Sequence, residues 1–213
     1  MQNTLPRSRG PPAREAALAA AAALTALAAP AAAQPQLFPT VPNPAGDYVL
    51  DPDRSSLLIK LGVAGGLGMA VVRFTRLDGG FVYPQGAGAP TQVRLNVDTT
   101  SATGPPWSRR AAISGLDVGR FPQATFLSDS VGKVGQDAWT VAGRLTLRGV
   151  TRPLTLKVSR ATAAGETAEG ERRVRVVGRG RISRSAYGVP APALTSDQMD
   201  LRFDVEFTRR GAD

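Results

Sequence analysis

The sequence predicts an all-β domain of about eight antiparallel strands, folded as a sandwich or a closed barrel. From residue 47 onward, apolar and polar side chains alternate with a period of two over most of the chain. Turn-forming residues are frequent, with 23 glycines and 17 prolines among 213 residues. The sequence has no repeat of fixed period and no shift in composition that would divide this region. The alternation gives each strand one buried face and one wet face, with no helices covering the outside.

The N-terminal segment has the features of a signal peptide. Three arginines precede an apolar run at 16–29, and Pro30 and three alanines follow this run. These small residues predict cleavage after Ala33, so residues 1–33 are expected to be removed from a periplasmic or secreted protein. The apolar run is shorter than the roughly 20 residues of a membrane-spanning helix, which argues against a permanent membrane anchor.

Behind this segment, four prolines at 34–46 predict an extended leader, and the domain is expected at 47–210. The clearest strand is 201–207, because Leu201, Phe203 and Val205 alternate with charged or polar residues. Strands are expected in the same way at 57–63, 72–74, 81–83, 93–97, 124–128, 139–147, 154–158 and 174–182.

Three segments between these strands differ from the alternating pattern. Asp78-Gly79-Gly80 is a turn signal. Residues 103–119 have weaker periodicity and contain a Gly-Pro-Pro breaker, so 107–116 is expected to be a short helix or an irregular segment. The polar residues 161–173 predict an exposed connection.

Composition excludes several kinds of site. The chain has no cysteine and no histidine, so it cannot form a disulfide, a thiolate site or a Ser–His–Asp triad. The formal net charge is +9. Arginines such as Arg94, Arg144 and Arg175 alternate with apolar residues, so we expect them on the wet outer face. A nucleic-acid site would need clustered charge and a readout element, so no nucleic-acid partner is expected.

Five stretches of the domain are distinctive when taken in order. The most specific is Gly143-Arg144-Leu145-Thr146-Leu147-Arg148-Gly149-Val150-Thr151, and the others cover 48–55, 73–79, 121–128 and 182–189. They resemble successive segments of the YceI-like family, over residues 47–208. Members usually carry a histidine at the position of Arg54 and another near Val63 or Ala64, and both are missing here.

The resemblance implies a single eight-stranded, lipocalin-like antiparallel barrel that is exported. It also implies a cavity that holds an isoprenoid chain, such as a polyprenol or the tail of a quinone. Closure of a barrel puts every alternate residue inside. The apolar residues expected to line the cavity are therefore Leu61, Phe74, Val93, Leu95, Phe126, Trp139, Val141, Leu145, Leu147, Leu156, Val176, Leu201, Phe203 and Val205.

A polar ligand headgroup would need donors near the mouth of the barrel. Arg109, Arg110 and Arg184 offer planar guanidinium groups that can pair with a phosphate, and Tyr187 offers a hydroxyl. No catalytic residue, metal site or cofactor is expected apart from the bound isoprenoid.

The expected function is therefore sequestration or transport of an isoprenoid lipid, with stress tolerance as a looser hypothesis. The alternative is a periplasmic interaction or inhibitor module with a filled barrel and no ligand, and the internal volume distinguishes the two. An enzyme with a pair of carboxylates is less favoured, because most acidic residues lie in outward strand phase or in turns. The sequence leaves open whether the chain forms a homodimer.

Overall fold

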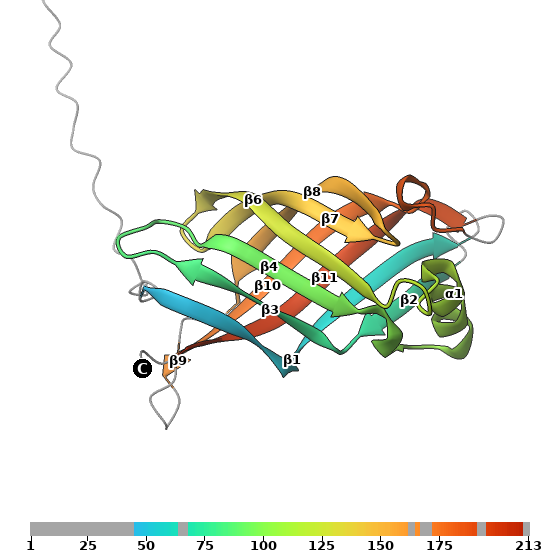
Figure 1. Ribbon diagram of the computed structural model, residues 1–213, viewed down its shortest axis with the longest axis horizontal. Helices are drawn as coiled ribbons and strands as arrows, with labels where there is room; N and C mark the ends of the chain where they lie inside the picture. Colours follow the sequence, from blue (N-terminus) through green and yellow to red (C-terminus); the bar gives the residue numbers. More distant parts are fainter. Residues whose placement is uncertain (1–44, 64–67, 162–164, 167–171, 191–194, 211–213) are drawn as a thin grey trace, which may run out of the picture. The chain divides into compact units, whose positions relative to one another are not determined.

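The computed structural model describes residues 45–63, 68–161, 165–166, 172–190 and 195–210, which are coloured in Figure 1. The expected signal peptide and nearly all of the expected leader lie outside the described residues and remain predictions. Within the described residues the fold is antiparallel β-sheet with one short helix.

The secondary structure follows the alternation of the sequence closely. One α-helix, α1 (Pro106–Leu116), and two short 3₁₀ turns, η2 (Thr99–Ser101) and η3 (Ser185–Tyr187), interrupt the strands. No helix among the described residues is long and apolar enough to cross a bilayer. The strands are β1 (Gly46–Val63), β2 (Gly68–Phe74), β3 (Leu77–Tyr83), β4 (Thr91–Asp98), β5 (Ala102–Thr103), β6 (Gln123–Gly135), β7 (Ala138–Leu147), β8 (Val150–Arg160), β9 (Gly165–Glu166), β10 (Arg172–Ser183) and β11 (Thr195–Arg209).

Eight of these strands close into a barrel. Neighbours pair in the order β11-β10-β8-β7-β6-β4-β3-β1, and β1 pairs again with β11. Every one of these pairings is antiparallel. The predicted eight-stranded barrel is thus confirmed.

Strand β1 changes its neighbour part-way along its length. Its first residues pair with β3, whereas its second half, from Leu57 to Val63, pairs with β2. Between the two halves the register with β11 shifts, from Asp51 to Ser56. This irregularity reverses the phase of the alternation, so that Leu50 and Leu57 both face the interior although they are seven positions apart.

Helix α1 covers the end of the barrel where β2 replaces β3. Apart from β1, β2 pairs only with the two-residue strand β5, which leaves its outer edge without a long partner among the described residues. Figure 1 shows α1 beside β2 at this end. The helix begins with Pro106 at its first position, where a missing N–H does no harm, and ends at Asp117 in the left-handed conformation. Of the two alternatives expected here, a short helix or an irregular segment, the structure has the short helix.

Aromatic side chains fill part of the opposite end of the interior. The rings of Tyr48 and Phe81 stack with centroids 4.7 Å apart, and Phe207 contacts Phe81 edge-on at 4.9 Å. All three residues are buried. Rings of this size contribute strongly to the free energy of folding.

The predicted turn at Asp78-Gly79-Gly80 is wrong. These residues lie inside β3, between β1 and β4, and the side chain of Asp78 accepts a hydrogen bond of 2.7 Å from Asn96. The glycines are required by close packing: a Cβ on Gly79 would collide with the carbonyl oxygen of Arg94, and one on Gly80 with that of Tyr48. Cross-strand packing, and not the turn propensity of glycine, decides the local structure.

Gly79→Ala should therefore lower the free energy of unfolding by about 2–4 kcal/mol, because Gly79 has a φ of +155° and no room for a methyl group. Urea unfolding monitored by circular dichroism measures the change. Gly132→Ala is the matched control, since nothing lies within 4 Å of a Cβ there. Equal stability of the two variants would contradict the packing argument.

Candidate ligand-binding cavity

Three apolar cavities lie inside the barrel. The helix cavity, about 290 Å³, lies under α1 against β1 and β2 and includes Leu61, Ala70 and Ser108. The middle cavity, about 60 Å³, includes Leu145, Leu147 and Leu201. The distal cavity, about 80 Å³, includes residues such as Val93, Trp139, Val141, Val176 and Val205.

Shared wall residues put the three cavities in one series. Ile59, Phe74 and Leu116 line both the helix cavity and the middle cavity. Another four residues line both the middle and the distal cavity: Leu95, Phe126, Leu156 and Phe203. The interior is thus a row of apolar spaces separated by side chains.

All fourteen residues expected to line a cavity lie on the wall of at least one of these three. They come from eight strands and meet because the alternation points them inward. Whether they contact a ligand remains a prediction. Phe81, Val174 and Phe207 also line the distal cavity, and the sequence analysis missed them although they are in the same phase.

Ser108 is the most unusual polar group on these walls. It lies in the first turn of α1, is only 1% exposed and faces the helix cavity. Among the described residues its Oγ has no hydrogen-bond partner. A buried hydroxyl without a partner costs roughly 1–3 kcal/mol, so this position favours a ligand atom that can complete the bond. Nothing in the local sequence marks Ser108, because its burial depends on how α1 is seated.

The distal cavity also has a charged group at its wall, but that group is already paired. Arg160 has a side chain only 7% exposed, and its Nη2 lies 2.9 Å from Oδ1 of Asp137. Its guanidinium also lies 5.9 Å from the ring centre of Trp139, whose Nε1 donates to the carbonyl of Gly88. The buried cation at this end therefore already has an acidic partner.

Arg184, expected near a headgroup, does line the helix cavity, but its guanidinium is occupied. It donates to the carbonyl oxygens of Val189 at 2.9 Å and Ser196 at 3.2 Å. These bonds tie the η3 segment to the start of β11. Arg184 thus positions one wall of the cavity.

The other three headgroup candidates lie away from the cavity walls. Arg109 and Arg110 are on the exposed side of α1, and neither lines a cavity. Tyr187 is only 2% exposed and packs in the core, where burial raises the pKa of its hydroxyl. A contact between these three residues and a headgroup is a prediction that this arrangement does not support directly.

Acidic residues do not gather around the cavities. None of the three cavities has an Asp or Glu on its described walls. Among the described residues there is also no group of three carboxylates that could hold a metal ion. The described walls are mainly apolar, and they offer no carboxylate pair for acid–base chemistry.

A sequence comparison now identifies the family. The model of the YceI-like domain family matches residues 48–207, which is almost the whole barrel. The chain belongs to the YceI-like family. A UPF0312 protein of Vibrio vulnificus (strain YJ016) is 34% identical over 167 residues, which are 76% of this chain and 87% of the relative. A UPF0312 protein of Shewanella denitrificans is 30% identical over 172 residues, 78% of this chain and 89% of the relative.

Solved structures have the same fold as this YceI-like protein. BcnA of Burkholderia cenocepacia superposes with a TM-score of 0.61 at 21% identity, covering 74% of this chain and 98% of BcnA. A polyisoprenoid-binding domain from Saccharophagus degradans superposes with a TM-score of 0.54 at 20% identity, covering 76% of this chain and 98% of that domain. At these identities the comparison establishes the fold.

The stability of the η3 segment, whose neighbours Arg184 and Val189 line the helix cavity, should depend on pH through Asp197. Hydrogen bonds from the hydroxyl of Ser183 and from Ser185, whose backbone N–H lies 3.0 Å away, hold the pKa of Asp197 below its ordinary value of 3.8. A lowered carboxyl pKa stabilises the fold fully above the ordinary value, and this stabilisation is lost as the pH falls through the lowered pKa.

We therefore expect Asp197→Asn to have a lower urea midpoint than the parent protein at neutral pH. The gap should narrow as the pH falls below 3.8, because the parent then loses the same charge. Parallel urea titrations along a pH series measure it. A gap that stays constant at all pH values would show that the charge of Asp197 does not stabilise η3.

Proposed function

We propose that this YceI-like protein binds the chain of an isoprenoid lipid in the row of cavities inside its barrel. The observation that carries the proposal is the row itself, three apolar spaces that share walls along the barrel interior. The polyisoprenoid-binding domain from Saccharophagus degradans, which has the same fold, supports the choice of ligand.

The physical basis of binding is burial of hydrocarbon. Each CH₂-sized group removed from water contributes about 0.8 kcal/mol, so a few isoprene units suffice for a stable complex. The two smaller cavities do not hold a chain as they stand. Ligand entry therefore requires Phe126 and Phe203, which separate them, to turn aside. The unfilled space favours this reading over the alternative of a solidly packed interaction module.

The polar end of the ligand should lie in the helix cavity. The hydroxyl of Ser108 lacks a partner there, whereas Arg160 at the distal cavity already pairs with Asp137. A hydroxyl or quinone carbonyl would complete the bond to Ser108, and the tail would extend into the middle and distal cavities. Together with the expected signal peptide, this arrangement supports carriage of the lipid through an aqueous compartment outside the cytoplasm.

A bulky residue in the helix cavity should block binding. Ala70 faces this cavity from β2, and Ala70→Phe should fill it at a cost in stability of roughly 1–3 kcal/mol. We expect at least a tenfold loss of affinity for a short-chain isoprenoid benzoquinone. Quenching of Trp139 fluorescence measures binding, in a Trp107→Phe background that removes the only other tryptophan.

Ala142→Phe is the matched control, because Ala142 lies between inward-facing Val141 and Gly143 and so faces outward. It should bind like the parent protein. If Ala70→Phe binds equally well, the ligand does not occupy the helix cavity. If the parent protein takes up neither the quinone nor a polyprenol, the proposed function is wrong.

Ser108→Ala tests the orientation of the ligand. The substitution should leave the stability of the free protein unchanged or raise it by up to about 1 kcal/mol, because it removes an unpaired buried hydroxyl. Affinity for a polyprenol should fall about five- to tenfold, corresponding to one hydrogen bond. Affinity for squalene, an isoprenoid without a polar end, should not change. Equal losses for both ligands would contradict the assigned orientation.

A further inference from the structure

The outer wall of the barrel carries three cations in one cross-strand row. Lys157 of β8 lies directly opposite Arg179 of β10, and Arg179 lies directly opposite Arg202 of β11. Side chains in such positions are about 5 Å apart at their Cβ atoms, and like charges there destabilise a sheet. Within the described part of the chain, no hydrogen bond or ion pair relieves any of the three.

The neighbouring arginines of β10 show that this arrangement is not general. Arg175 makes two hydrogen bonds to the carboxylate of Asp204, and Arg181 donates to Asp200 at 2.7 Å. Both acids are supplied by β11. At Arg179, between them, β11 supplies Arg202 instead. The sheet neutralises its outward arginines on either side of this row and leaves the row itself uncompensated.

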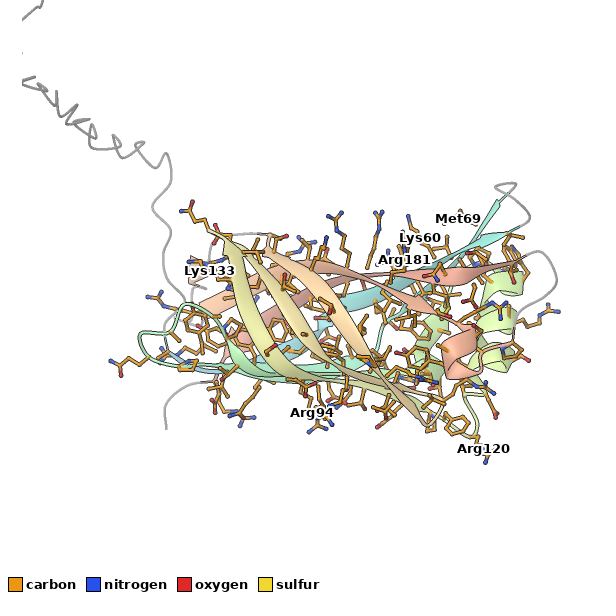
Figure 2. All side chains as sticks on the ribbon, turned by 90° about the horizontal axis from the view of Figure 1, so that it is seen from above. Lys60, Met69, Arg94, Arg120, Lys133 and Arg181 are labelled. Atoms are coloured by element: carbon orange, nitrogen blue, oxygen red, sulfur yellow. The ribbon has the colours of Figure 1, made fainter. Side chains whose placement is uncertain are left out.

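The row lines an open groove of about 910 Å³ on the outer wall. Arg73 of β2 adds a fourth cation, and Asp204 is the one acid among the described residues of the groove, so its net charge is +3. Val134, which is 68% exposed, also lines the groove. Figure 2 shows Lys60, Lys133, Arg181 and the half-exposed Met69 projecting from one side, and Arg94 and Arg120 from the opposite side.

We propose that this groove docks the protein onto a membrane surface rich in anionic phospholipids. The cations of the row attract phosphate headgroups, and exposed Val134 can enter the boundary between headgroups and acyl chains. A soluble polyanion would use the cations but has no contact for the exposed apolar side chains. Only the biological role of this docking rests on the proposed function, since a lipid carrier has to meet the membrane that supplies or receives its lipid.

The row also lies directly behind the cavities. Lys157 and Arg202 alternate along their strands with Leu156, Leu201 and Phe203, whose side chains line the interior. Docking through the row would therefore place the wall of the middle and distal cavities against the headgroups.

Co-sedimentation with vesicles tests the inference. The protein is purified from bacteria as they produce it. It should bind vesicles of phosphatidylglycerol and phosphatidylcholine but not vesicles of phosphatidylcholine alone. The double variant Arg179→Gln/Arg202→Gln should partition onto the anionic vesicles roughly 30-fold more weakly, because each cation near an anionic leaflet contributes about fivefold. Binding of the parent protein should weaken as salt is added.

The matched control is Arg94→Gln/Arg120→Gln, which removes the same charge from the opposite side and should bind vesicles within about twofold of the parent protein. Arg179→Gln/Arg202→Gln should keep the parent affinity for the isoprenoid quinone, because neither residue lines one of the three interior cavities. Loss of docking is then separable from loss of ligand binding. Equal losses in the two double variants would overturn the inference. So would binding of dextran sulfate without binding of anionic vesicles.

Discussion

Hydrogen bonding between β1 and β11 is the contact on which the rest of this structure depends. It joins the first and last long strands of the described chain, and it converts a strongly twisted sheet into a barrel with an inside and an outside. The pairing tolerates a register shift between Asp51 and Ser56, where the buried hydroxyl of Ser55 accepts the backbone N–H of Glu206 at 3.1 Å. Because the shift reverses the alternation of β1, its two halves can both point apolar residues inward while they pair with different neighbours, β3 and then β2.

The change of neighbour also creates the helix cavity. Where β2 takes over from β3, no long strand continues the sheet toward β4, and α1 covers the space. Helix α1 lines this corner with small residues of its own, such as Ala112 and Gly115, and so fills it less completely than a strand with large side chains would. The largest apolar space and the unpaired hydroxyl of Ser108 therefore occur together, at the one place where helix packing replaces strand pairing.

Period-two alternation predicted which side chains face the interior, because barrel closure alone determines this. It predicted little about the rest of the candidate site. Leu61, Leu95 and Val205 could be assigned to the interior because each lies in an alternating run, and closure turns every such run inward. Phe81 was missed because it follows Gly79 and Gly80, whose turn propensity is overridden by their close approach to β4 and β1. The headgroup region was harder still. The run of Ser108, Arg109 and Arg110 favours the arginines on chemical grounds, but the seating of α1 buries the serine and exposes both arginines.

The same alternation that makes the interior apolar makes the outer wall basic, since each inward residue is followed by an outward one. The number of charges along the strands therefore says little about function. Whether each charge has an opposite charge on the neighbouring strand says more. Arg175 and Arg181 each pair with an aspartate of β11, and such cross-strand pairs are the usual arrangement on a solvent-exposed sheet face. Lys157, Arg179 and Arg202 face one another, and their mutual repulsion lowers the stability of the barrel. No described ion pair offsets this loss. Sites where a sheet keeps such a local conflict are commonly functional, and here the conflict lies one side chain away from the cavities.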